Sequence, residues 1–376
     1  MTFVSLAVIR KSDDDLGHLM LLAQQKQGLD VFFRALPRQR FLGVRTEKQL
    51  VAERDSYRLT PHVQPEYPHR ATMTRLFRHV KFPLPPDKRR QYKCRMSQNA
   101  TALPVEPGAR DLYVDAELYD HEYRRRKADV AWYRQLAKDV AAVQTKQRPI
   151  LELGSGTGRL LVPLARDGHQ VIGVDRSPQM VLRCQQRLSR QSQRVAQNVQ
   201  LIEADFRALP LDCSPSERFR LIVCPFNGLL HLYERQDLER FLAEVRRLLH
   251  PDGLFAFDAA NPDPQWLARD PNRRWSRTRF RHPRTGEPLV YSTNHDYDPA
   301  SQVMTMRLFY EPDAKANWPT PSPPRTVILT QRMYFPAELA ALLHYNGFSL
   351  WYRAGGFDGQ PLSPVSAEQV ICARVR

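Results

Sequence analysis

From residue 111 onward, the apolar positions follow two alternating patterns: short apolar runs of strand length, and longer stretches with helical spacing. Ser177 and Pro178 are residue types that favour a helix N-cap and its first position. Buried strands are predicted at 148–153, 170–175, 199–205, 220–227 and 253–262, and helices at 128–143, 159–169, 177–191 and 237–249. Short apolar strands that alternate with helices indicate right-handed βαβ units, and therefore a parallel sheet with helices on both faces.

Residues 263–332 depart from this alternation. They are typical of an insertion of two or three strands, with turns at RTGEP and YDPAS. The proline-rich stretch EPDAKANWPTPSPPRT near the end of the insertion predicts a loop. We expect this insertion to lie over the functional site as a lid, or to form a contact between two copies of the chain in a homodimer.

The first 108 residues combine prolines with basic residues and show little apolar periodicity, which predicts a poorly ordered extension ahead of a regular domain at 109–376. They carry 19 Lys and Arg against 10 Asp and Glu, more than half of the net charge of +16 in less than a third of the 376 residues. Such an arm binds nucleic-acid phosphates or is simply solvated, and the lack of an RNA-binding signature favours the second interpretation. We also hypothesise that Met96 is the biological start and that residues 1–95 are an upstream extension of the reading frame.

Neither a membrane span nor a secretory signal is predicted. The longest apolar runs, such as 219–224, are much shorter than the roughly 20 residues of a spanning helix, and acidic residues follow the short apolar N-terminus. The five cysteines lie far apart and form no C-x-x-C pair, which does not indicate a disulfide framework or a zinc site. The expected location is the cytoplasm.

The stretch ILELGSGTGRL (150–160) carries the strongest signal for chemistry. Gly154, Gly156 and Gly158 follow a predicted strand and precede a helix, where glycines permit a tight turn and a close approach of backbone N–H groups to a ligand. Asp175 ends the next strand, where a carboxylate accepts the two hydroxyls of a ribose. Ligands of open parallel sheets bind beyond the carboxyl ends of the strands, so a nucleoside derivative is predicted.

The spacing E-L-G-S-G-T-G resembles motif I of the class I S-adenosylmethionine-dependent methyltransferases, with its third glycine one position earlier than in a dinucleotide fingerprint. The resemblance continues through VIGVDRSPQM, LIEADFRALPL and FRLIVCPFNGLLHL to the closing helix and strand pair before residue 376. It implies an α/β fold with a Rossmann-like, doubly wound, seven-stranded sheet, mostly parallel with one reversed strand. It also implies S-adenosyl-L-methionine as cofactor and S-adenosyl-L-homocysteine as product.

The resemblance assigns cofactor roles by position. Asp175 matches the ribose-binding acid, and Asp205 with Phe206 matches the position beside the adenine. The stretch LYDHEYRRRK is similar to small-molecule N-methyltransferases, including those that dimethylate amino sugars, and this places Tyr119 and Tyr123 over the methionine end; the alternative is that both are ordinary helix residues. The expected cofactor-binding residues are Tyr119, Tyr123, Glu152, Gly154, Ser155, Gly156, Thr157, Gly158, Asp175, Arg176, Met180, Asp205, Phe206, Cys224, Pro225 and Phe226.

Methyl transfer is an in-line displacement at a sulfonium carbon, so a protein mainly supplies alignment, a dry site and, where needed, a base. Asn227 and His231 lie at the carboxyl end of the fourth strand and are the candidate catalytic residues. His231 is either a proton acceptor or a packed histidine. Asp258 and Asn261 lie at the end of the fifth strand, where they either orient a substrate or cap the next turn.

Tyr291 and Tyr310 of the insertion are candidates for the wall of a substrate pocket, or ordinary sheet residues. No metal is expected, because no further ligand run accompanies His295, Asp296 and Asp298.

The expected function is methyl transfer to nitrogen or oxygen of a small metabolite. The alternative is a nucleic-acid methyltransferase that uses the basic arm. Enzymes that methylate base amino groups usually carry N/D-P-P-Y/F after the fourth strand, where this chain has CPFN without the first polar residue and one proline. A protein methyltransferase is a further alternative without specific support, and a dinucleotide oxidoreductase does not fit the glycine spacing.

Overall fold

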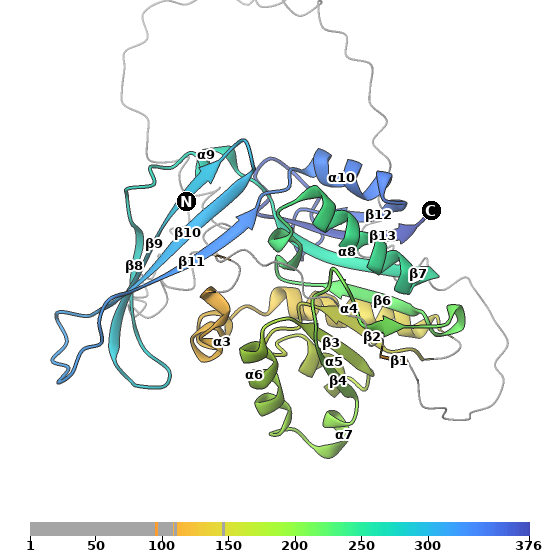
Figure 1. Cartoon of the computed structure of the whole chain (residues 1–376), viewed down its shortest axis with the longest axis horizontal. Helices are drawn as coiled ribbons and strands as arrows, with labels where there is room; N and C mark the ends of the chain where they lie inside the picture. The colour runs from red at the N-terminus through yellow and green to blue at the C-terminus, as the bar shows by residue number, and fades with distance from the viewer. Residues whose placement is uncertain (1–94, 97–107, 109–110, 145–146) are drawn as a thin grey trace, which may run out of the picture.

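The computed structural model describes residues 95–96, 108, 111–144 and 147–376. These residues form a seven-stranded mixed sheet and a four-stranded antiparallel sheet. Figure 1 shows the two sheets beside each other, with the short helix α3 (Ala116–Tyr123) between them. No helix of the described ranges is long and apolar enough to cross a membrane.

The seven-stranded sheet has the order β12-β13-β7-β6-β2-β3-β4. Strand β13 runs antiparallel to both of its neighbours, whereas the remaining pairs are parallel. The strands are β2 (Ile150–Leu153), β3 (Val171–Asp175), β4 (Val199–Glu203), β6 (Phe219–Cys224), β7 (Leu249–Ala260), β12 (Phe348–Ala354) and β13 (Glu368–Val375). The predicted doubly wound sheet with one reversed strand is confirmed.

Helices cover both faces of this sheet because successive strand residues point to opposite sides. Ile150 packs in a cluster with α4, α5 and α6, while its neighbour Leu151 packs in a cluster with α8 and α10. The Ser177 hydroxyl accepts a hydrogen bond from the Met180 backbone N–H, as predicted for an N-cap. The helices are η5 (Asp111–Tyr113), α4 (Ala128–Ala142), α5 (Leu161–Arg166), α6 (Pro178–Leu188), α7 (Gln193–Ala196), η6 (Pro215–Glu217), η7 (Gly228–His231), α8 (Arg235–Leu248), α9 (Pro264–Leu267) and α10 (Pro336–Tyr345).

Strand β7 begins earlier than predicted. HPDG was expected to separate a helix from a strand beginning at residue 253, yet β7 already starts at Leu249. Phe219 pairs with Leu249 and Leu221 pairs with Leu254, so the extra residues are absorbed as an irregularity in the register.

The insertion contains one strand more than expected. The four-stranded sheet has the order β11-β10-β9-β8, with strands β8 (Trp275–Arg281), β9 (Pro288–Asp298), β10 (Val303–Pro312) and β11 (Arg325–Arg332). The prediction of two or three strands missed β11, an edge strand that directly follows the proline-rich loop. Its inward residues Val327 and Leu329 pack against Leu112 and Leu118, which come from far earlier in the chain.

The N-terminal extension mostly lies outside the described residues, and its expected disorder and the proposed start at Met96 stay predictions. Its described part includes strand β1 (Arg95–Met96), which pairs antiparallel with β5 (Leu211–Asp212). Cys213, which directly follows β5, is disulfide-bonded, a pairing that the cysteine spacing did not indicate. Cys184, Cys224 and Cys372 are free and buried.

The packing predicts a contrast between two leucines. Leu238 of α8 is fully buried, so Leu238→Ala should leave a cavity and lower the free energy of unfolding by about 2–5 kcal/mol. Leu182 of α6 is 55% exposed, so Leu182→Ala removes the same atoms with an expected effect within about 0.5 kcal/mol. Urea denaturation measures both variants, and equal losses would contradict this description of the core.

Candidate active site

The glycine loop after β2 has a left-handed backbone at all three glycines. The φ angles of Gly154, Gly156 and Gly158 are 73°, 54° and 79°, which L-residues with a Cβ rarely adopt. A Cβ at Gly158 would lie 2.6 Å from the Cys184 sulfur of α6, whereas a Cβ at Gly154 or Gly156 would meet no atom within 4 Å. Gly158 therefore permits close packing on α6, and the first two glycines border open space.

Asp175 fixes this loop from the end of β3. Its Oδ2 accepts a hydrogen bond from the Gly156 N–H at 2.7 Å, and its Oδ1 accepts one from the Ser177 N–H at 2.9 Å. Burial raises the pKa of Asp175, although both hydrogen bonds favour the charged form. The structure thus brings Asp175 and the glycine loop together, as the sequence predicted.

Glu152 is the acid of β2 that precedes the glycines. Its side chain is buried, and its Oε2 has no hydrogen-bond partner among the described residues. Burial raises the pKa of Glu152 well above its usual range, and the charge of Arg159 only partly opposes this shift. A buried carboxylate oxygen without a donor is costly, so this position favours a ligand that brings a cation or a hydrogen-bond donor.

Three aromatic rings meet beside the loop that follows β6. The ring centres of Tyr119 and Tyr123 lie 4.7 Å apart, and those of Tyr123 and Phe226 lie 4.9 Å apart. The guanidinium groups of Arg126 and Arg159 each lie 4.7 Å from the centre of the Phe226 ring. The structure therefore unites the two tyrosines of LYDHEY with the aromatic residue of CPFN.

The backbone of this loop is held by residues that the sequence suggested for other roles. Phe226 and Asn227 have φ angles of 56° and 62°. Asp258 Oδ1 accepts hydrogen bonds from the Phe226 N–H at 2.8 Å and the Tyr133 hydroxyl at 2.7 Å, and Asn227 Oδ1 accepts one from the Ala260 N–H at 2.7 Å. These bonds stabilise a strained turn and support the Phe226 ring.

Asp258 and Asn261 do not line the cavity described below. Asn261 donates through Nδ2 to the Ser366 carbonyl at 2.9 Å, so it tethers the segment that precedes β13. Their contacts support holding these loops, which differs from both predicted roles, orienting a substrate and capping the next turn.

The proposed adenine position is already engaged by protein. Arg207 Nη2 donates to Asp205 Oδ2 at 2.7 Å, while Arg207 Nη1 donates to Asp237 Oδ2 at 2.7 Å. The Phe206 ring packs 5.1 Å from the ring of Phe241 in the core. A ligand at this position therefore has to use the remaining lone pairs of Asp205. Met180, Cys224 and Pro225 are buried, and Arg176 is half-buried.

His231 ends η7 and faces Tyr113 of η5. The Tyr113 hydroxyl lies 2.6 Å from His231 Nε2. Burial and, to a lesser extent, the positive charge of Arg176 lower the pKa of His231 to about 3. The imidazole is therefore neutral at pH 7 and a weak base.

A cavity of about 590 Å³ lies between α3, the four-stranded sheet and the loop after β6. Aromatic and methionine side chains form part of its wall, beside Asn227 and five arginines: Tyr119, Tyr123, Phe226, Trp266, Phe280, Tyr291, Met304, Met306 and Met333, with Arg124, Arg125, Arg126, Arg279 and Arg281. Tyr291 was predicted in this wall. Tyr310 is buried behind it, and its hydroxyl donates to Glu122 Oε1.

Glu122 is the residue that the sequence interpretation missed. It lines the cavity, and burial raises the pKa of Glu122 to about 7. The signal was its place in LYDHEY, between the two tyrosines already singled out.

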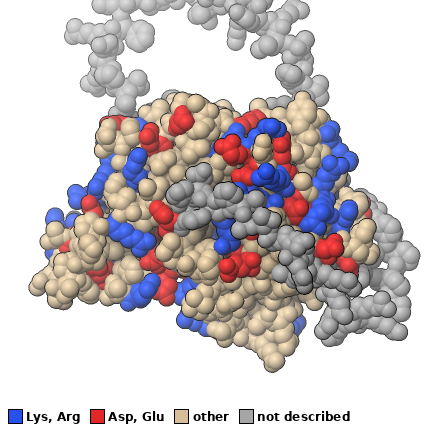
Figure 2. All heavy atoms as spheres, in the orientation of Figure 1, with Lys and Arg blue, Asp and Glu red and all other residues tan. Residues whose placement is uncertain are grey.

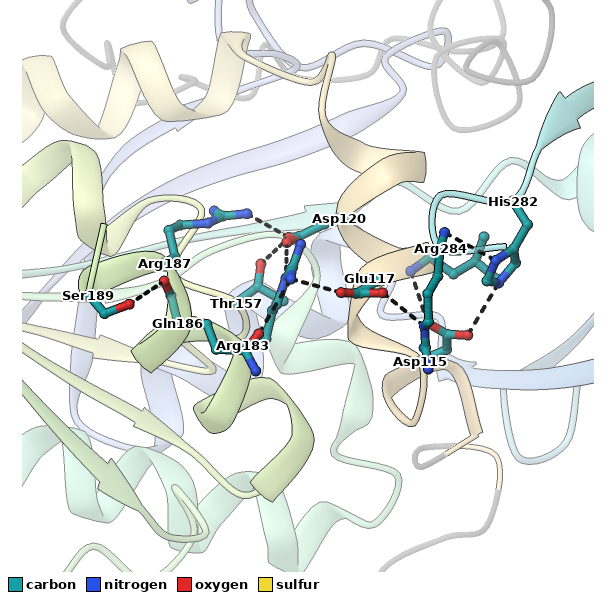
Figure 3. Close-up of polar contacts among 11 residues, drawn as sticks. Asp115, Glu117, Asp120, Thr157, Arg183, Gln186, Arg187, Ser189, His282 and Arg284 are labelled. Carbon is teal, nitrogen blue, oxygen red and sulfur yellow. Dashed lines mark hydrogen bonds and ion pairs between the residues drawn. The ribbon is translucent and has the colours of Figure 1, made fainter. Parts of the chain in front are cut away.

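Helix α3 is tied to both parts of the molecule by ion pairs, shown in Figure 3. Asp120 accepts hydrogen bonds from Thr157 Oγ1 of the glycine loop at 2.5 Å, Arg183 Nε at 2.9 Å and Arg187 Nη2 at 2.7 Å. Toward the four-stranded sheet, Asp115 pairs with Arg284 at 3.6 Å. The cavity and the glycine loop therefore share one helix as a wall.

His295, Asp296 and Asp298 do not converge. The His295 ring stacks on Trp266 at 3.9 Å, and the Asp298 carboxylate accepts from Ser301 at the β9–β10 turn. Within the described ranges, no three His, Cys, Asp or Glu side chains form a group that could hold a metal ion.

Residues 150–253 match a family model described as a methyltransferase domain. The chain carries a methyltransferase domain. This domain includes Glu152, the glycine loop, Asp175, Asp205 and the loop after β6. Helix α3 and the four-stranded sheet lie outside the matched residues.

Several curated relatives of the chain are named as N-methyltransferases. A glycine/sarcosine N-methyltransferase of Parasynechococcus marenigrum is 28% identical over 139 residues, which are 37% of this chain and 45% of the relative. The N-methyltransferase FrzE of Cladobotryum is 28% identical over 131 residues, 30% of this chain and 43% of that protein. The chain thus spans less than half the length of these relatives.

Solved structures show that the likeness in fold extends beyond the matched domain. The CcbJ methyltransferase of Streptomyces caelestis is 24% identical, covers 66% of this chain and 95% of its own, and has a TM-score of 0.54. CalS10, an amino pentose methyltransferase of Micromonospora echinaspora, is 17% identical, covers 69% and 96%, and has a TM-score of 0.50.

The ion pairs of α3 predict a local effect. Asp120→Asn removes the charge that binds both arginines, and charge-assisted hydrogen bonds contribute about 1.5–3 kcal/mol each. We expect amide hydrogen exchange across Ala116–Tyr123 to become about tenfold faster or more, measured by mass spectrometry.

Asp139→Asn is the matched control, because Asp139 of α4 contacts only the Gln135 amide of its own helix among the described side chains. It should leave exchange in α3 unchanged. Unaltered exchange in both variants would show that Asp120 does not hold the helix.

Proposed function

We propose that the chain transfers a methyl group from S-adenosyl-L-methionine to a nitrogen or oxygen atom of a small molecule. The observation that carries this proposal is the Glu152 oxygen that has no hydrogen-bond partner in the described part of the chain, beside a glycine loop that borders open space. The N-methyltransferase names of the relatives favour nitrogen as the acceptor.

The residues present fit this cofactor. Glu152 offers a free carboxylate oxygen to its ammonium group, and Asp175 offers the remaining lone pairs of its carboxylate to the ribose hydroxyls. Gly154 and Gly156 leave room along the loop, and the faces of Tyr119, Tyr123 and Phe226 attract a cation such as a sulfonium. When bound, the cofactor supplies an electrophilic methyl group whose leaving group is a neutral thioether.

The chain contributes alignment and dryness. The aromatic and methionine side chains of the cavity exclude water, and the fixed Phe226–Asn227 turn sets one edge of the space where the acceptor lies. His231 stays neutral and hydrogen-bonded to Tyr113, which lines the cavity, so we assign it to holding Tyr113 in place rather than to removing a proton from the acceptor. Asn227 lines the same cavity as Tyr113, and we assign it to positioning the acceptor.

The nucleic-acid alternative depended on the basic arm, which lies almost entirely outside the described residues. On the face of the molecule in Figure 2, basic and acidic side chains of the described part are interspersed rather than gathered into one basic stripe. This pattern does not favour a phosphate-binding surface on that face.

The test is transfer of labelled methyl from S-adenosylmethionine by the full chain, offered a metabolite extract and, separately, total RNA. Label in an extractable small molecule is the expected result. Label in RNA would overturn the small-molecule proposal, and transfer to neither pool would contradict the proposed activity.

Glu152→Gln is expected to weaken S-adenosylhomocysteine binding about tenfold or more while stabilising the ligand-free protein. Burial raises the pKa of Glu152 above its value in the unfolded chain, so the ionised carboxylate destabilises the folded state. This loss of stability is absent below the unfolded pKa and grows as the pH rises above it. The free energy of unfolding of the variant should equal that of the parent near pH 4.5 and exceed it by about 1–3 kcal/mol at pH 8. Calorimetric titration and urea denaturation at both pH values measure the two effects.

Glu239→Gln controls for the loss of charge alone, because Glu239 lies on α8 in an exposed ion pair with Arg235. It should alter neither binding nor the pH dependence of stability. A Glu152→Gln protein that binds the product as tightly as the parent would remove Glu152 from the cofactor site.

A further inference from the structure

Glu122 is a carboxylate in the wall of the cavity that the proposed function has not used. It is enclosed by protein on most sides, yet keeps partial exposure because its side chain faces the cavity. Tyr310 of β10 donates a hydrogen bond to Glu122 Oε1. A single side chain from a distant strand therefore fixes the direction of the carboxylate.

The groups around Glu122 leave its charge only weakly compensated. Arg325 of β11 is a cation that lowers the pKa of Glu122, but Arg325 also lies 3.5 Å from Asp115, whose negative charge raises it. Burial and, next, the negative charge of Glu122 raise the pKa of the Tyr123 phenol on α3 and of the Tyr291 phenol on β9. Both phenols are neutral at pH 7 and therefore supply no positive charge to Glu122.

The balance of these effects places the pKa of Glu122 at about 7, with burial as the main cause and the hydrogen bond from Tyr310 opposing it. A base with a pKa near the working pH is efficient in proton transfer. The imidazole of His231, with a pKa of about 3, is not such a base.

The aromatic part of the cavity wall beside Glu122 complements a positive charge. Tyr123, Phe226 and Tyr291 line the same space as Glu122, and aromatic faces attract an ammonium group. Five arginines also line it. Arg279 is paired with Asp313 at 2.8 Å, Arg126 is paired with Asp129 and Glu368, and Arg281 donates to the Gly286 carbonyl at 3.0 Å. Arg124 and Arg125 are exposed to solvent, which screens their charge.

Resting on the proposed function, we propose that Glu122, positioned by Tyr310, binds the acceptor as an ammonium ion and takes the proton that the amine must lose before methyl transfer. An N–H bond of the ammonium breaks, its electron pair stays on nitrogen, and the proton passes to a Glu122 oxygen. The nitrogen lone pair then forms a bond to the methyl carbon while the carbon–sulfur bond breaks and its electrons stay on sulfur. Glu122 returns its proton to water when the methylated amine leaves. The acceptor class is therefore an amine rather than an alcohol.

The experiment follows the labelled product that the full chain forms from a metabolite extract. An amine product binds a cation exchanger at acidic pH, and its rate of formation should rise as the pH increases through about 7, because ionised Glu122 is the active form. Glu122→Gln should lower kcat/KM about 100-fold or more and abolish this rise, with S-adenosylhomocysteine affinity unchanged.

Tyr310→Phe separates a proton-transfer role from a merely structural one. It removes the hydrogen bond that lowers the pKa of Glu122, so the rise in rate should move to higher pH while the maximum falls only modestly. Glu239→Gln on α8 is the control and should retain both the rate and its pH dependence.

The outcomes also separate this inference from the proposed function. A labelled product that is not retained by the cation exchanger would overturn the role of Glu122 and leave the methyltransferase activity intact. A Glu122→Gln protein with undiminished kcat/KM, or a Tyr310→Phe protein with an unshifted profile, would overturn it as well. If the full chain transferred methyl to no molecule and did not bind S-adenosylhomocysteine, the proposed function and the role of Glu122 would both be refuted.

Discussion

The contact between Asp120 and the two arginines of α6 holds the parts of the site together. Asp120 also accepts from Thr157 of the glycine loop, so α3 is fixed against the end of the seven-stranded sheet. The helix then presents Tyr119 and Tyr123, four residues apart, to the loop after β6, while Glu122 turns to the cavity. The ion pairs of Asp120 on one side of this eight-residue helix thus fix the positions of the two tyrosines and of Glu122 on its other sides.

The buried acids of the site differ in whether a nearby cation compensates their negative charge. Asp129 is paired with Arg159 at 2.5 Å, and the contact with this guanidinium lowers the pKa of Asp129 despite burial. Among the described residues, neither Glu152 nor Glu122 forms an ion pair with an arginine, and burial raises the pKa of each. Buried acids with a structural role are normally paired. A buried carboxylate whose charge the protein does not compensate therefore indicates a place where a ligand can bind and supply the compensating group.

The sequence predicted what is encoded locally. The apolar runs and the glycine spacing located the parallel sheet, the loop and Asp175 because each depends on neighbours within a few tens of residues. Asp258 and Glu122 were misjudged or missed because their partners, Tyr133 and Tyr310, lie 125 and 188 residues away. Strand β11 was not predicted for the same reason, because an edge strand after a proline-rich loop can be identified only from its pairing with a neighbouring strand.

The four-stranded sheet enters the chain between β7 and α10 and contributes residues to the cavity but none to the glycine loop. Its inward residues Leu308, Val327 and Leu329 pack in a cluster separate from the two that flank the seven-stranded sheet. Changes at positions such as Thr293 or Gln331, which face the cavity, reshape the acceptor space without disturbing the strands that carry Glu152 and Asp175. Under the proposed function, the acceptor space is thus shaped largely by strands other than those that carry Glu152 and Asp175, and α3 is an element that the two share.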